Sequence, residues 1–365
     1  PSGNSLALYN FLNLQTDLNY DIWWTGQKGG STSYQFDNFR ATPERTASII
    51  SHISYLIFLM RFKILLFEGA GDLSFYVRFL SNRRDRSKVL LNHGFCLKSS
   101  GVLAPSLTSM QREIWRNVGE SFDIFSVTSK LEKYLLSSTY NGAVEKFQVL
   151  GPQRFVNQED FSQEEKIEAR KLISDFYDVQ FKNSDSIIFY TPTHRDHLKN
   201  NERPVLFGFD DLPELDQLLS GANVFLFVRE HGLAVSVNSD GYSNIIYTAD
   251  RGHIDFHRVA PGINGLITDY SGIFLELLCT DVKVGFWHYD YSEYQASRGF
   301  SIADSVFDCG WRISDQNSFG EFINSARVPS EMRIKRSMWH SNLFENSTQD
   351  ALKMTSQMIN KLIDL

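Results

Sequence analysis

The sequence has little cysteine and no long apolar segment. Its three cysteines, Cys96, Cys279 and Cys309, are odd in number and far apart, which argues against a disulfide framework or a zinc site and favours a reducing cytoplasm. The most apolar stretch, residues 53–60, is followed at once by Arg61 and is too short to cross a bilayer. We therefore predict a buried helix at this stretch.

Charge excess, repeats and metal-ligand patterns are also missing. The net charge of −7 argues against a nucleic-acid-binding protein, so a polyanionic partner would have to meet local basic patches. No internal repeat, low-complexity tract or metal-ligand spacing stands out. The acidic pair within residues 209–211 resembles a metal-binding DxD motif only loosely and is interpreted as the start of a helix. We expect no required cofactor and no nucleic-acid partner.

Short apolar segments alternate with helical patterns along most of the 365 residues. Hydrophobic residues make up 42% and charged residues 22%, a composition typical of globular proteins, and the length suits two domains. The alternation predicts an α/β fold built on parallel sheets. Strands are predicted at 21–24, 63–67, 88–92, 123–127, 146–150, 186–190, 223–228, 243–248, 265–268 and 283–287, and helices at 43–60, 108–118 and 346–365.

A polar stretch with glycine and proline interrupts this alternation at residues 151–165. We place a domain boundary there. The sequence thus predicts one Rossmann-like domain at 1–152, whose first strand is expected to precede Pro1, a second at 153–345, and a terminal helix at 346–365. Two such domains are predicted to face each other across a cleft, because sheets of this kind bind ligands at the carboxyl ends of their strands.

The segment at residues 265–278 reads as a strand, a polar turn and a helix. Free backbone N–H groups at a helix start near Ser271, with the positive end of the helix dipole, suit a phosphate. Hydroxyl groups of Thr268 and Ser271 would add donors, and Gly272 would let the backbone approach closely. The alternative is an ordinary N-cap that satisfies the first helical turn, and the turn taken alone favours this alternative.

A histidine follows the strand predicted at 88–92. His93 precedes Gly94, and Lys98 lies a few residues further along. An imidazole at the carboxyl end of a strand can project into a cleft, and its ordinary pKa of ~6.5 suits a general base. The alternative is a histidine that merely caps the strand.

Three further loops carry charged residues after predicted strands. Thr193 and Arg195 follow the first of them, and a guanidinium can clamp phosphate through two hydrogen bonds. His231 follows the next strand, and Arg298 lies within residues 289–304. The alternative for Arg195 is a surface ion pair with Asp196.

Taken in order along the chain, these segments resemble the CDP-glycerol glycerophosphotransferase family, which contains teichoic acid primases and polymerases and related capsule polymerases. The resemblance runs from about residue 2 to about residue 310, and its most specific parts are Pro-Thr-x-Arg-Asp at 192–196 and Thr-Asp-Tyr-Ser at 268–271. The chain departs from the family's usual Trp-His-Gly-Thr at residues 92–95, from the proline that often follows the second histidine, here Gly232, and by inserting Gln153 before an arginine.

The resemblance implies a GT-B fold, with the first domain on the acceptor side and the second binding a CDP-linked donor. It implies transfer of glycerol phosphate or ribitol phosphate from CDP-glycerol or CDP-ribitol to a hydroxyl of a growing teichoic acid or capsule chain, with release of CMP. His93 would be the general base, and His231 would stabilise the transferring phosphate or the leaving group. The residues that would bind the donor are Thr193, Arg195, Thr268, Asp269, Tyr270, Ser271, Gly272 and Arg298.

The implied acceptor is an anionic polyol-phosphate or glycan chain. A basic run at residues 82–88 precedes the strand that leads to His93, and it would meet this acceptor or an anionic membrane face. A second basic run at 333–336 is interpreted as a solvated surface loop. The expected location is the bacterial cytoplasm, on the inner face of the cytoplasmic membrane. The residues that would contact the acceptor are Arg83, Arg84, Arg86 and Lys98.

Two other functions remain open from the sequence. A glycosyltransferase that uses a nucleotide sugar would have the same GT-B fold. A non-catalytic binding protein with two lobes is the second, although a binder has no need of a general base.

Overall fold

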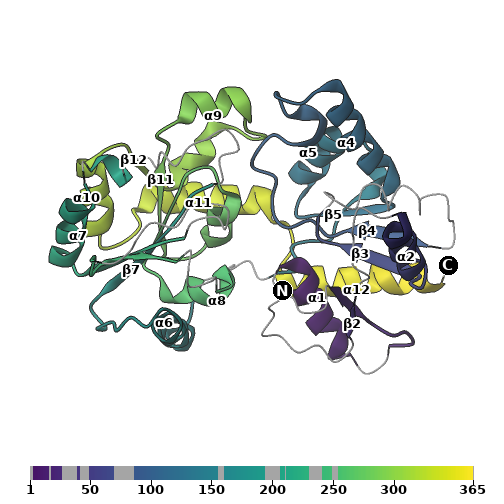
Figure 1. Cartoon of the computed structure of the whole chain (residues 1–365), viewed down its shortest axis with the longest axis horizontal. Coiled ribbons are helices and arrows are strands. Elements are labelled where there is room, and N and C mark those ends of the chain that lie inside the picture. Colours follow the sequence, from purple (N-terminus) through teal and green to yellow (C-terminus); the bar gives the residue numbers. More distant parts are fainter. Residues whose placement is uncertain are drawn as a thin grey trace. The chain divides into compact units, whose positions relative to one another are not determined.

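The structure is a computed structural model that describes residues 3–15, 18–26, 39–41, 49–69, 86–154, 160–193, 206–209, 211–229, 241–248 and 254–364. The chain divides into two compact units, Pro1–Val156 with Asn342–Leu365, and Asn157–Ser341 (Figure 1). The sequence predicted a division after residue 152 and a separate terminal helix, whereas α12 (Thr348–Asp364) is part of the first unit. Within the described residues, no helix is long and apolar enough to cross a membrane.

The first unit contains a four-stranded parallel sheet in the order β3-β4-β5-β6. Its strands are β3 (Ile64–Phe67), β4 (Ser87–Leu90), β5 (Ile124–Val127) and β6 (Phe147–Val149), each within two residues of its predicted range. The strand predicted at 21–24 is instead β1 (Trp24–Gly26), which pairs in parallel with β2 (Phe39–Ala41). The α-helices of this unit are α1 (Asn4–Asn13), α2 (Ile49–Leu59), α4 (Ser109–Ser121), α5 (Lys130–Tyr140) and α12.

Apolar residues cover both faces of this sheet. One cluster joins α2, α4 and α5 to the strands through Phe58, Val118, Phe122, Phe125 and Leu136. The helix predicted to be buried at 53–60 is buried on one side only, because Ile53 and Ile57 are 51% and 54% exposed. The other joins α1 and α12 to β4 through Leu8, Val89, Leu352 and Ile359. Further along α12, Met358 lies in this cluster, Leu362 and Ile363 pack against it, and Met354 is exposed. Burial on both faces explains why these strands read as continuous apolar runs.

The second unit contains a six-stranded parallel sheet in the order β12-β11-β10-β7-β8-β9. Numbered along the chain, this is the order 3-2-1-4-5-6 of doubly wound folds, with the switch point between β7 and β10. The strands are β7 (Ser186–Thr191), β8 (Val224–Val228), β9 (Ile245–Tyr247), β10 (Gly265–Thr268), β11 (Lys283–Trp287) and β12 (Trp311–Ile313), and of these only β12 was not predicted.

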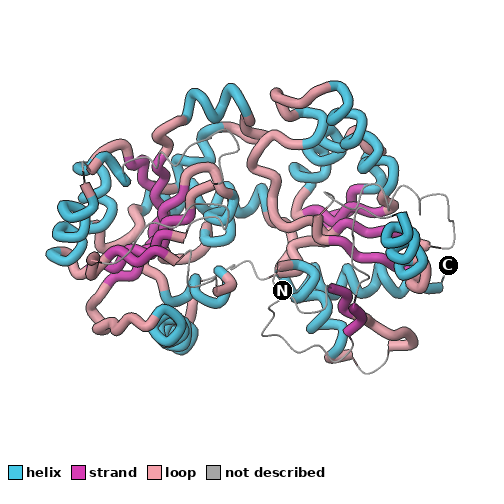
Figure 2. The backbone as a smooth tube through the Cα atoms, viewed as in Figure 1, coloured by secondary structure: helices cyan, strands magenta, loops and turns pink. Residues whose placement is uncertain are grey.

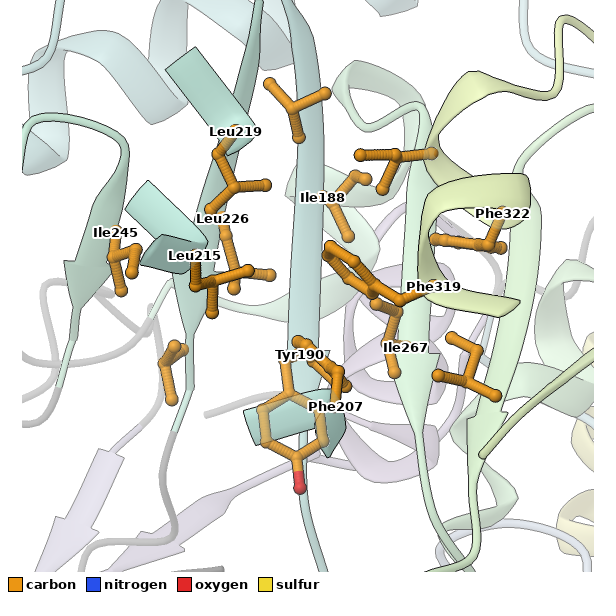
Figure 3. Close-up of a cluster of buried hydrophobic side chains, with 14 of the residues drawn as sticks. Ile188, Tyr190, Phe207, Leu215, Leu219, Leu226, Ile245, Ile267, Phe319 and Phe322 are labelled. Atoms are coloured by element: carbon orange, nitrogen blue, oxygen red, sulfur yellow. The ribbon is translucent and has the colours of Figure 1, made fainter. Parts of the chain in front are cut away.

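Helices lie on both sides of this sheet, as Figure 2 shows. On one face Ile188, Leu226 and Ile267 of the sheet pack against side chains of α7 and α10 (Figure 3). On the other face Phe189 and Phe227 stack at 5.0 Å between ring centroids. The helices of this unit are α6 (Gln163–Tyr177), α7 (Leu212–Gly221), α8 (Phe256–Val259), α9 (Tyr291–Ser297), α10 (Gln316–Asn324) and α11 (Ser330–Leu343).

Two predicted elements of the second unit are corrected. The helix expected to begin near Ser271 is the 3₁₀ helix η6 (Gly272–Leu277). Its residues 274–277 are all buried, more than one face of an amphipathic α-helix, so packing on every side sets the backbone. The basic run at 333–336 lies in α11 rather than in a solvated loop. Arg336 is 1% exposed because its guanidinium donates to the carbonyl oxygens of Thr280, Val282 and Cys309.

Candidate functional site

His93 lies in the loop that follows β4, at the carboxyl edge of the first sheet. Its neighbours have unusual backbone angles, with φ of 60° at Asn92 and 145° at Gly94, and its own N–H donates to Asn92 Oδ1 (3.0 Å). The side chain is exposed. The strand thus delivers the imidazole to the edge at which parallel sheets bind ligands.

A set of polar contacts surrounds this loop, and the sequence did not reveal it. Asn4, at the start of α1, donates from Nδ2 to the carbonyl of Asn92 (2.7 Å) and accepts at Oδ1 from the N–H of Arg154 (2.8 Å). Its own N–H donates to Oε1 of Glu68 (2.8 Å), just beyond β3. The edge therefore holds Asn4, Glu68, His93 and Arg154 together, although they come from distant parts of the chain.

The surroundings of His93 favour its neutral form. Burial by nearby protein atoms lowers the pKa of the imidazole from 6.5, the charge of Arg154 lowers it further, and Glu68 opposes both. A neutral imidazole has one ring nitrogen with a free lone pair, which is the state required of a general base.

The predicted acceptor residues differ in what they contact. Lys98 lies close enough to His93 for its charge to lower the imidazole pKa. Arg86 donates from its guanidinium to the carbonyls of Phe62 (2.6 Å) and Leu59 (3.5 Å) at the end of α2, where a cation stabilises the unpaired carbonyls. Its contact with an acceptor stays a prediction. Arg83 and Arg84 lie outside the described residues.

In the second unit, two of the predicted segments meet at the switch point between β7 and β10. The backbone N–H of Thr193 donates to both carboxylate oxygens of Asp269 (2.9 Å each), and its hydroxyl donates to Oδ1 (2.5 Å). The pair ties together the ends of the two central strands. Thr193 is partly exposed, and its contact with the donor stays a prediction.

Three residues of the Thr-Asp-Tyr-Ser segment are buried rather than presented to a ligand. Thr268, Asp269 and Tyr270 are all 0% exposed. The Thr268 hydroxyl donates to the carbonyl of Thr191 (2.8 Å), and the Tyr270 hydroxyl donates to Asp290 (2.9 Å). Their side chains therefore hold the edge together, and their contact with the donor stays a prediction.

The remaining residues predicted to bind the donor differ in their exposure. Ser271 and Gly272 are partly exposed, and Ser271 Oγ accepts a long hydrogen bond from the N–H of Ile273 (3.4 Å). Arg298 is exposed at the end of α9. Arg195 and His231 lie outside the described residues.

A further histidine lies at this edge and was missed. His288 follows β11, bonds through Nε2 to the carbonyl of Asp269 (3.0 Å), and stacks on Tyr270 at 4.9 Å. Because a carbonyl only accepts, Nε2 carries the proton, and burial lowers the pKa of the ring. The rule that found His93, a histidine directly after a predicted strand, would also have found His288.

A cavity of 490 Å³ opens at the opposite, amino-terminal edge of the second sheet. Its charged groups already bond within the protein. Lys166 pairs with Asp160 (2.7 Å), and Lys283 donates to three carbonyls at the end of α10. The carboxyl edge, not this cavity, is therefore the candidate site of the second unit.

A family model described as CDP-Glycerol:Poly(glycerophosphate) glycerophosphotransferase matches residues 1–354 of the chain. The chain belongs to this family. The match includes both carboxyl edges described above.

A curated relative is similar to part of the chain. The chain is 28% identical over 197 residues to the teichoic acid glycerol-phosphate primase of Bacillus subtilis (strain 168), which covers 53% of this chain and 48% of the relative. The match therefore spans about half the length of that relative.

Two solved structures show the fold. The wall teichoic acid polymerase TagF matches with a TM-score of 0.74 and 17% identity, over 100% of this chain and 86% of that one. The Anabaena protein Alr3699/HepE, in complex with UDP and glucose, matches with a TM-score of 0.54 and 9% identity, over 99% and 96%. The predicted α/β fold of the GT-B type is thereby confirmed for this glycerophosphotransferase family member.

Proposed function

We propose that this chain transfers glycerol phosphate or ribitol phosphate from a CDP-linked donor to a hydroxyl of a growing cell-surface polymer, a teichoic acid or capsule chain. The family match over residues 1–354 supports the reaction class. The observation that carries the mechanism is the place of His93, in a loop that Asn4 anchors at the carboxyl edge of the sheet, where its surroundings lower the pKa of the imidazole.

In the proposed reaction the acceptor hydroxyl attacks the phosphorus that bears the polyol. A new P–O bond forms to the acceptor, the bond to the bridging oxygen of the diphosphate breaks, and CMP leaves with that oxygen. The neutral imidazole of His93 takes the proton of the attacking hydroxyl, a role worth ~10²- to 10⁴-fold in rate. Cations near the diphosphate stabilise the charge that develops on the leaving group.

The donor is proposed to bind at the carboxyl edge of the second sheet. The predicted residues that are exposed or partly exposed there are Thr193, Ser271, Gly272 and Arg298. Arg195 and His231 are proposed to add the charges that hold the diphosphate. Asp269 keeps the ends of β7 and β10 joined, so that these groups start from a fixed frame.

The acceptor is proposed to approach His93 past the cations Arg154 and Lys98, whose charges reach the imidazole. Both suit an anionic polyol-phosphate or glycan chain. The proposed reaction differs from that of a nucleotide-sugar glycosyltransferase in the group transferred, because the polyol moves together with a phosphate.

We also propose that the chain docks on the inner face of the cytoplasmic membrane through α2. Ile50, Ile53 and Ile57 lie on one side of this helix and are 75%, 51% and 54% exposed. Arg61 follows the helix and is exposed. An apolar stripe with an adjacent cation suits the boundary between headgroups and acyl chains. Flotation with anionic vesicles should fail for an Ile53→Ser, Ile57→Ser variant, and unchanged flotation would reject α2 as the docking element.

The deciding experiment is a donor screen with detection of the released nucleotide. We expect CMP release from CDP-glycerol or CDP-ribitol in the presence of a polyol-phosphate acceptor, and no reaction with UDP- or GDP-sugars. Reaction with a nucleotide sugar alone would establish the glycosyltransferase instead. Binding of a CDP donor without any turnover would favour the non-catalytic alternative.

A further inference from the structure

One carboxylate of the first unit is buried close to the loop that carries His93. Glu132 lies in the first turn of α5 and is 1% exposed. The spacing Ser129-x-x-Glu132 is that of a capping box, in which the glutamate would accept from the backbone of the N-cap residue. Ser129 does accept from the N–H of Glu132 (3.2 Å), but the carboxylate binds elsewhere.

The Glu132 carboxylate joins two loops at the same sheet edge. One oxygen, Oε2, accepts from the N–H of Thr128 (2.7 Å) and from its hydroxyl (2.9 Å). The other, Oε1, accepts from the N–H of Cys96 (3.3 Å). Glu132 thus links the turn between β5 and α5 to the loop after β4, and Figure 1 labels these three elements.

His93 lies between two anchors of its loop. On the amino-terminal side the carbonyl of Asn92 accepts from Asn4 Nδ2 (2.7 Å). On the carboxyl-terminal side the N–H of Cys96 donates to Glu132. Between them Asn92 has a φ of 60°, which is sparsely populated by residues other than glycine, and the two anchors hold the backbone on either side of His93.

We propose that Glu132 is a positioning residue for His93, whose carboxylate fixes the Cys96 peptide and thereby holds the loop that directs the imidazole. This inference rests on the proposed function, because it assigns Glu132 a role through the general base. The carboxylate has no ion-pair partner among the described residues, and a buried carboxylate without one is costly. A glutamine at this position would complete a capping box as well as a glutamate does. We therefore assign the charge of Glu132 to the three donor groups that converge on its carboxylate.

Protonation of Glu132 would remove this support. Burial raises the pKa of Glu132 to about 7, and hydrogen bonds from Thr128 and Cys96 oppose the rise. The titratable groups that face it are the Cys96 thiol and the Tyr140 hydroxyl, and burial raises the pKa of Tyr140 further above its ordinary value, so this hydroxyl is neutral at pH 7. An O–H on the carboxyl would turn a donor toward the donor of Cys96 or Thr128. The loop should therefore loosen as the pH falls through about 7.

The test compares Glu132→Gln with Thr128→Val. Two donors converge on Oε2, so the single amide oxygen of the glutamine should turn to them and leave the Cys96 N–H without its acceptor. We expect Glu132→Gln to lower kcat ~10- to 100-fold with donor KM within about twofold, and Thr128→Val, which leaves the Cys96 bond intact, to lower kcat less than about threefold. Equal losses in both variants would mean a merely structural role and overturn the proposal.

A second arm tests whether Glu132 acts through His93. In a His93→Ala background, Glu132→Gln should change the residual rate less than about twofold, because the group that it positions is gone. A further loss equal to that in the wild-type background would show independent action and overturn the proposal.

The third arm needs no turnover and so separates failure of this inference from failure of the proposed function. By NMR, the Cys96 amide proton of the unmodified protein should shift with a midpoint near pH 7, and the titration of the His93 imidazole should move in Glu132→Gln but not in Thr128→Val. A Cys96 amide that stays constant between pH 5.5 and 8.5 (roughly 1.5 units either side of the pKa) would overturn the inference even if CMP release is observed.

Discussion

The carboxyl edges of the two sheets hold their polar residues in opposite ways. In the first unit His93, the candidate general base, is exposed. Asn4 and Glu132, whose side chains bond to the loop that carries it, are buried. In the second unit the predicted motif itself is buried, with Asp269 and Tyr270 at 0% exposure. We call His93 a presenting residue, because its side chain is exposed at the edge, and Asp269 and Tyr270 framing residues, because their buried side chains bond parts of the edge to one another.

The difference shows that a polar run after a strand has two possible uses. At β10 the carboxylate of Asp269 accepts from the backbone of Thr193 and from the N–H of Tyr270 (2.5 Å), which closes the gap at the switch point. At β4 the hydrogen bonds that close the loop come from other elements, so His93 keeps its side chain for the ligand. The predictions below test this division between presenting and framing residues.

The largest effect is expected at the presenting residue. His93→Ala should lower kcat by ~10²- to 10⁴-fold, because the attacking hydroxyl loses its base. The free energy of unfolding should change little, since the side chain is exposed. His52→Ala, on α2 of the same unit, is the control and should retain activity. Loss of donor binding in His93→Ala, measured by calorimetry with retained folding, would instead make His93 a donor ligand.

The framing residue should show the reverse pattern. Asp269→Asn removes a buried charge that accepts from Thr193 and Tyr270, and hydrogen bonds to charged groups contribute ~1.5–3 kcal/mol each. We expect the free energy of unfolding in urea to fall by about 2–3 kcal/mol. A loss of activity at unchanged stability would contradict the framing role and return Asp269 to the donor site.

The pH profile should report the lowered pKa of His93. An imidazole whose folded pKa lies below 6.5 stays neutral at more acidic pH than a free one, so the His93 contribution to the acid limb of kcat/KM should lie below 6.5 and fall about tenfold per pH unit beneath it. His93→Ala assigns the limb, because any acid limb that persists in the residual rate of that variant belongs to another group, such as Glu132. A limb above 6.5 that His93→Ala leaves unchanged would show that another group controls the pH dependence.

The sequence predicted the strands of both sheets well because each is an apolar run that packs on both faces. It predicted neither β12, which has only three residues, nor the 3₁₀ form of η6, whose burial on every side is a product of tertiary packing. It located His93 from its place after a strand. It could not locate Asn4, Glu68 or Glu132 as partners of that loop, because their contacts join positions 36 to 88 residues apart in the chain.

The smallest effects are expected at two neighbouring residues, Tyr270 and Ser271. One substitution should change stability alone, and the other should change donor affinity alone. Tyr270→Phe removes a buried hydrogen bond to Asp290 and should lower the free energy of unfolding by ~1 kcal/mol, with donor affinity unchanged. Ser271→Ala removes only a long contact to Ile273, so stability should change by less than ~0.5 kcal/mol, while donor affinity falls because the partly exposed hydroxyl is lost. Thermal unfolding and calorimetric titration of a CDP donor measure both quantities. If Tyr270→Phe weakens donor binding more than Ser271→Ala does, the buried Tyr270 belongs to the ligand site. The proposed difference between the two edges would then be wrong, because Tyr270 would contact the donor and would not act only as a framing residue.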